Sequence, residues 1–190
     1  MRENLGDANI DFHQYGGYEL FMENEPERAE EALDHLTYFN NLLKQAIGSA
    51  DIYAVADAKI ADFGLKGVNR IIYTPYEGQL HTGKMMRTLL NRVYEQDILV
   101  LNNCSVNQIE NEDDKIRLQT SQGDFIAPKV ILATNAFAAQ LYPQLDVIPG
   151  RGQVLVTKPV PGLKLKGTYH FNEGYYYFRN INGRVLFGGG

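Results

Sequence analysis

Residues 26–47 carry the longest helical periodicity in the chain, and this stretch limits what the rest can fold into. Apolar residues recur there at steps of three and four, with Asn24 and Pro26 at the start, Gly48 at the stop and a charged opposite face. An amphipathic helix of this length must bury its apolar stripe against another element. The preceding segment, Phe12 to Met22, places aromatic residues around Gly16 and Gly17, which indicates a strand bulged by a close backbone approach. We therefore expect the helix to pack on a sheet.

The remaining patterns alternate between helix and strand. They predict a second helix from Met85 to Glu95 with Thr82 as its N-cap, and a short helical stretch from Ala136 to Leu141. Strand patterns cover Ile98–Leu101, a meander between Cys104 and Ala127, the apolar run Lys129–Ala133, and segments within 147–157 and 168–187. We expect an α+β fold in which the Tyr18, Val154 and Tyr176 regions share one antiparallel or mixed sheet.

Composition excludes several classes of function. Lys and Arg number 18 against 23 Asp and Glu, without long blocks of either sign, which argues against nucleic acid or an anionic membrane surface as partner. Cys104 is the single cysteine, and no apolar run approaches the length of a membrane span, so we expect a cytoplasmic protein. The four histidines are far apart and predict no metal site. No nucleophile or acid–base constellation stands out, and the catalytic residues stay unknown.

Five segments in a fixed order carry a resemblance to a known family. The chain resembles the D-amino-acid oxidase superfamily of FAD-dependent oxidoreductases, which includes glycine, sarcosine and γ-glutamylputrescine oxidases. The matching segments cover nearly the whole chain: residues 15–20 (YGGYEL), 77–84 (EGQLHTGK), 130–136 (VILATNA), 149–157 (PGRGQVLVT) and 183–190 (GRVLFGGG).

The resemblance implies a domain layout. Residues 10–75 and 146–190 correspond to the two parts of a sheet-based substrate domain, and residues 76–145 to an incomplete piece of a Rossmann-like FAD-binding domain. It further implies oxidation of a C–N bond in a small amine or amino acid by hydride transfer to flavin. Orientation of the substrate and a dry pocket are then the protein's contribution.

The resemblance also assigns site residues. The cofactor-binding candidates are Val106, Ala133, Thr134, Asn135, Gly188 and Gly189. The bland alternative for Thr134 and Asn135 is a turn and N-cap. Related oxidases place a tyrosine on the strand before the closing glycines, where its hydroxyl meets the substrate carboxylate, and Tyr177 is the positional match. Tyr175 and Arg179 fall on the same face of that strand by alternation, and Tyr176 and Phe178 on the other.

The sequence also departs from the family pattern. The family opens with a strand and a Gly-x-Gly-x-x-Gly helix that accepts the flavin pyrophosphate, and that motif does not occur in these 190 residues. We therefore expect a fragment that is inactive and free of FAD when isolated. We also expect the edge of strand Lys129–Ala133 to be exposed and to favour homo-oligomers. The alternatives are a non-catalytic packing or binding domain, and a flavin-linked RNA-modifying relative that the negative charge disfavours.

Overall fold

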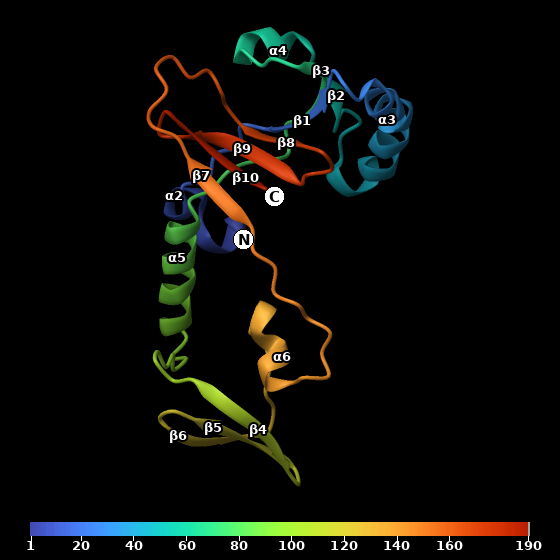
Figure 1. The fold of residues 1–190 in the computed structure, drawn as a ribbon. Coiled ribbons are helices and arrows are strands. Elements are labelled where there is room, and N and C mark those ends of the chain that lie inside the picture. Colours follow the sequence, from blue (N-terminus) through green and yellow to red (C-terminus); the bar gives the residue numbers. More distant parts are fainter. Residues whose placement is uncertain (190) are drawn as a thin grey trace. The chain divides into compact units, whose positions relative to one another are not determined.

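The structure, a computed structural model, describes residues 1–189 and forms two compact units. Among the described residues, unit 1 comprises 1–91 and 152–189, and unit 2 comprises 92–151. Gly190, the end of the closing glycine-rich segment and of the predicted third domain part, lies outside the described residues. The α+β class predicted from the sequence is confirmed, with a mixed seven-stranded sheet in unit 1 (Figure 1).

The large sheet joins the three strand regions predicted to share it. Its order is β2-β3-β1-β8-β9-β10-β7, and every neighbouring pair is antiparallel except β1 and β8. The strands are β2 (Ala54–Val55), β3 (Val68–Thr74), β1 (Gly17–Met22), β8 (Thr168–Phe171), β9 (Tyr176–Ile181), β10 (Arg184–Gly189) and β7 (Gln153–Val156).

The two faces of this sheet are packed differently. One, the core face, buries Tyr18, Leu20, Ile71 and Tyr169 beneath the short helix α4 (Ala58–Phe63), whose Phe63 meets the Tyr18 and Tyr169 rings edge-on. These stacked and edge-on aromatic pairs make this the principal core of the molecule.

The opposite face, here called the α3 face, is covered at its β1 and β3 end by helix α3 (Pro26–Ile47). The helix has the predicted bounds, with Pro26 in its first turn and Gly48 closing it at φ 77°, a left-handed conformation that glycine adopts without strain. Ala29 is buried against Phe21 and Ile72, so a small residue allows the helix to approach the sheet closely.

The first half of the chain contains three further helices, α1 (Arg2–Leu5), α2 (Asp7–Ile10) and α5 (Thr82–Tyr94). The predicted N-cap of α5 was wrong, because Thr82 is already helical. His81 does the capping instead: its Nδ1 accepts the Lys84 amide hydrogen at 3.2 Å, and its carbonyl accepts that of Met85 at 3.0 Å. Among residues 1–189 no helix is both long and apolar enough to cross a membrane.

Unit 2 contains the predicted meander. Strands β4 (Val106–Glu112), β5 (Lys115–Thr120) and β6 (Gly123–Ala127) form an antiparallel three-stranded sheet, followed by a 3₁₀ turn η1 (Asn135–Phe137) and helix α6 (Ala138–Leu141). Arg117 bridges Glu112 and Asp124 across this sheet. No residue between 92 and 151 is buried, so unit 2 has a sheet without a core of its own.

Two predicted strands do not form. Ile98–Leu101 is irregular, with Leu99 77% exposed, and Lys129–Ala133 is irregular, with Ile131 91% exposed. Both segments have the apolar composition of a strand, but a strand also needs a neighbouring strand to hydrogen-bond its N–H and C=O groups. In the part of the chain that the structure describes, no strand pairs with either segment. The expected exposed edge is thus an exposed apolar segment that is not a strand.

Candidate functional site

The candidate site lies on the α3 face, where strand register brings distant residues into line. Glu19 on β1 pairs with His170 on β8, His170 with Tyr177 on β9, and Tyr177 with Gly188 on β10. Directly opposed residues in neighbouring strands point to the same side of the sheet. Glu19, His170 and Tyr177, here called the polar row, therefore share one face although 158 positions separate the first from the last.

Tyr177 lies against Gly188. A Cβ added to Gly188 would overlap the phenol ring, including its Cζ and hydroxyl oxygen, so the ring covers a position that only glycine leaves free. Tyr177 is 43% exposed, and its neighbours in sequence, Tyr176 and Phe178, point to the core face, where they pack on Phe171 and Tyr169. This fixes the position of the ring while leaving its outer surface free for a ligand.

A second line of residues runs beside the polar row. Arg179 pairs with Thr168, which in turn pairs with Gly17. The Arg179 Nη1 donates to the Leu80 carbonyl at 3.4 Å, and the Thr168 hydroxyl donates to Glu77 Oε2 at 3.2 Å. The Glu77 carboxylate sits directly over Gly17, at the point where a side chain would otherwise stand. Tyr177 and Arg179 thus share a face, as alternation predicts.

Tyr175 has a different setting from these two residues. It precedes β9, in a turn where its amide donates to the Asn172 carbonyl at 3.0 Å, and its side chain is 55% exposed. Its ring meets that of Tyr176 edge-on. The structure therefore brings Tyr177 and Arg179 together on the sheet and leaves Tyr175 at the rim.

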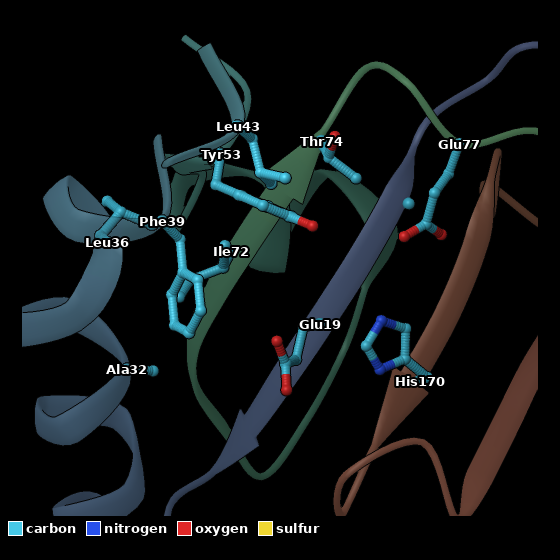
Figure 2. Close-up of a pocket in the computed structure, with 11 residues that line it drawn as sticks. Glu19, Ala32, Leu36, Phe39, Leu43, Tyr53, Ile72, Thr74, Glu77 and His170 are labelled. Carbon is cyan, nitrogen blue, oxygen red and sulfur yellow. The ribbon is translucent and has the colours of Figure 1, made fainter. Parts of the chain in front are cut away.

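A cavity of about 290 Å³ lies between α3 and the sheet, next to the polar row (Figure 2). Figure 2 shows Glu19 and His170 projecting from adjacent strands, with the apolar side chains of α3 across from them. The lining residues are Gly17, Glu19, Ala32, Leu36, Phe39, Leu43, Tyr53, Ile72, Thr74, Glu77 and His170.

The cofactor candidates divide between the two units. In unit 2, Val106 and Thr134 line one cavity of about 660 Å³, together with Ile131 and Phe137. Ala133 and Asn135 flank Thr134, and Asn135 adopts a positive φ of 49°. Thr134 occupies the N-cap of η1 but its side chain makes no capping hydrogen bond. Gly188 and Gly189 belong to β10 of unit 1.

Sequence reasoning missed Glu19, His170 and Glu77. A signal for Glu19 was present, since it is a charged residue inside the otherwise apolar and aromatic run Tyr18–Met22. His170 and Glu77 gave none, because their relation to Glu19 and Gly17 arises from pairing between distant strands. The described residues hold no group of three or more metal-ligating side chains.

Comparison with models of known protein families shows which family this chain belongs to. The model of the FAD-dependent oxidoreductases of the D-amino-acid oxidase type matches residues 1–190. The chain belongs to this FAD-dependent oxidoreductase family. An 80-residue stretch is 30% identical to N-methyl-L-tryptophan oxidase of Yersinia pestis (strain Pestoides F), covering 42% of this chain and 22% of that protein.

Solved structures show the same fold for this chain. Glycine oxidase from Bacillus cereus ATCC 14579 superposes with a TM-score of 0.75 at 18% identity, over 98% of this chain and 51% of that one. L-proline dehydrogenase from P. horikoshii gives 0.72 at 14% identity, again over 98% and 51%. The chain thus spans about half the length of these solved relatives and less than a quarter of the curated oxidase.

Proposed function

We propose that the protein carrying this chain oxidises a C–N bond of a small amine or amino acid with FAD as the hydride acceptor. The observation that carries the proposal is the placement of Tyr177 and Arg179 on one face of the large sheet, where His170, the cross-strand neighbour of Tyr177, lines the cavity beside α3. The Tyr177 hydroxyl and the Arg179 guanidinium are two hydrogen-bond donors of the kind that bind a carboxylate. Glycine oxidase, a fold relative, is named for an amino-acid substrate, which is consistent with this reading.

The residues of unit 2 fit one end of the cofactor. Val106 and Thr134 share a cavity, Ile131 and Phe137 offer it exposed apolar surface, and no described residue accepts the amide hydrogens of residues 130–133. Free amides and apolar surface suit the phosphate and ring parts of a dinucleotide. We propose that Val106, Ala133, Thr134 and Asn135 contact FAD there, and that Gly188 and Gly189 contact it from β10. When bound, FAD supplies the two-electron acceptor.

In this proposal, the residues of the chain itself bind the substrate and orient it. Tyr177 donates its hydroxyl hydrogen to the substrate carboxylate, and Arg179 adds a positive charge two positions along the same face. Tyr175, at the rim, is proposed as a further contact that helps to keep water from the reacting carbon. The proposed substrate domain corresponds to residues 10–75 and 146–190, and the partial FAD-binding domain to residues 76–145.

The test compares Tyr177→Phe with Tyr176→Phe in the full-length, flavin-loaded protein. Losing one hydrogen bond to a charged group costs about 1.5–3 kcal/mol, so Tyr177→Phe should lower kcat/KM by about 10- to 150-fold with the flavin spectrum retained. Tyr176 stacks on Phe171 on the core face, so Tyr176→Phe should leave kcat/KM nearly unchanged. Equal, small effects from the two variants would remove Tyr177 from the site.

A further inference from the structure

The cavity beside α3 has apolar walls on one side. Leu36, Phe39 and Leu43 face it from the helix, and Tyr53 and Ile72 close it from the sheet end (Figure 2). Walls of this kind favour the methylene groups of a ligand over water. An aliphatic arm therefore suits this space.

The opposite side of the cavity is acidic. The Glu19 carboxylate is half-buried and has no hydrogen-bond or ion-pair partner among residues 1–189, and the Glu77 carboxylate is held by Thr168. The lining contains no Lys or Arg, and the His170 Nδ1 is buried without a partner in the described chain. A partly buried carboxylate is stabilised by an opposite charge that comes to it. Glu19 therefore lacks a partner of opposite charge among the described residues that line the cavity.

The cavity and the Tyr177 position are parts of one surface. His170 lines the cavity and is the direct cross-strand neighbour of Tyr177, and Glu19 lies one strand further. The Tyr177 hydroxyl lies over Gly188 on β10, which is three strand spacings of about 4.8 Å from β1, so it is about 14 Å from the strand that carries Glu19. An extended chain advances about 3.5 Å per three bonds, so a ligand whose end groups are about seven bonds apart spans about 8 Å, and a hydrogen bond of about 2.8 Å at each end brings the total to about 14 Å.

We propose that this cavity binds the positively charged end of a basic amino-acid substrate. The carboxylate of the substrate lies at Tyr177 and Arg179, its methylenes pass over His170, and its terminal ammonium enters the cavity and pairs with Glu19, facing the apolar side chains of α3. This inference rests on the proposed function and names the substrate class for the same site. Specificity then comes from Glu19, because only a ligand that carries a distal cation satisfies this half-buried carboxylate.

The activity test uses a matched pair of substrates in the full-length, flavin-loaded protein. Lysine is compared with 2-aminoheptanoic acid, which carries a methyl group in place of the terminal ammonium, for each enantiomer. The ratio of their kcat/KM values should favour lysine by about tenfold or more, and Glu19→Gln should lower that ratio by about the same factor. Glu30→Gln, an exposed carboxylate of α3, is the control and should leave the ratio unchanged. An unchanged ratio in Glu19→Gln would overturn the inference.

A binding test separates this inference from the proposed function. By calorimetry, 6-aminohexanoic acid should bind at least about tenfold more tightly than heptanoic acid, because both lack an α-amino group and only the first carries the cation. Glu19→Gln should abolish the difference, and Ala32→Leu, which narrows the cavity, should weaken both. If Glu19-dependent binding is found but no amino acid is oxidised, the cavity assignment stands and the oxidase proposal fails. If amino acids are oxidised but neither binding nor the lysine preference depends on Glu19, the oxidase proposal stands and the cavity assignment fails.

Discussion

Gly188 and Tyr177 depend on each other at the scale of single residues. Because a Cβ at Gly188 would overlap the Tyr177 ring, Gly188→Ala must displace the ring or strain β10. We expect a loss of about 1–3 kcal/mol in the free energy of unfolding, measured by urea denaturation. Gly152→Ala, where the added Cβ meets no atom within 4 Å, should change stability by less than about 0.5 kcal/mol. Similar losses in both would mean that the ring does not occupy this position.

The buried phenol of Tyr169 should make the free energy of unfolding depend on pH in the alkaline range. Burial raises its pKa well above the usual value, against a smaller opposing effect of its hydrogen bonds with Lys166, and burial likewise raises the pKa of Tyr18. A phenol with a raised pKa contributes stability that is complete below its unfolded pKa of about 10 and is lost as pH rises towards its folded pKa. Tyr169→Phe should cost about 1–3 kcal/mol at neutral pH and flatten the decline above pH 10. Tyr38→Phe, 60% exposed, should show the wild-type profile.

Single residues also mark what the sequence could and could not predict about the site. Alternation along β9 correctly placed Tyr177 and Arg179 on one face, because that rule acts within a strand. The polar row combines β1, β8 and β9, and which residues oppose each other across strands depends on register between segments about 150 positions apart. No local pattern encodes that register, so Glu19 and His170 could not be joined to Tyr177 from sequence.

The elements that could be predicted are those whose start, end and apolar pattern are encoded within their own sequence. Helix α3 has a periodic apolar stripe, a proline in its first turn and a glycine at its end, and the structure gives it the predicted bounds. The meander β4–β6 was likewise confirmed from period-two alternation and tight turns. Segments 98–101 and 129–133 have the composition of buried strands, yet composition does not supply the neighbouring strand that they need.

The N-terminus of helix α5 is capped by His81 in the structure, whereas the sequence predicted Thr82. His81→Ala removes the acceptor of the Lys84 amide and should lower the free energy of unfolding by about 0.5–2 kcal/mol, whereas His81→Asn should keep most of it. Thr82→Ala should be nearly neutral, because Thr82 is already the first helical residue. Thermal unfolding of the three variants checks this, and a larger loss from Thr82→Ala than from His81→Ala would restore threonine as the cap.

At the scale of the whole molecule, unit 2 exposes apolar surface without a core to bury it. We expect the 190-residue chain to self-associate through segment 129–133, where Ile131 is 91% exposed. Light scattering should show a mass that rises with concentration, and Ile131→Asp should suppress the rise. Ile148→Asp replaces an equally exposed residue outside the segment, at 87%, and should not. A monomer at high concentration would contradict the expectation.

The single parallel pair in the large sheet has a consequence for how the chain folds. Strands β2, β3 and β1 come from the first part of the chain, and β8, β9, β10 and β7 from the last, so only β1 and β8 connect the two groups. Gly167 permits the join, since a side chain there would strike the Gly16 carbonyl. Each group contains antiparallel neighbours that can find each other locally, whereas the join must close a loop of about 150 residues and its chain entropy. We therefore expect the polar row, and the side of the cavity that His170 lines, to form in a late and slow step of folding.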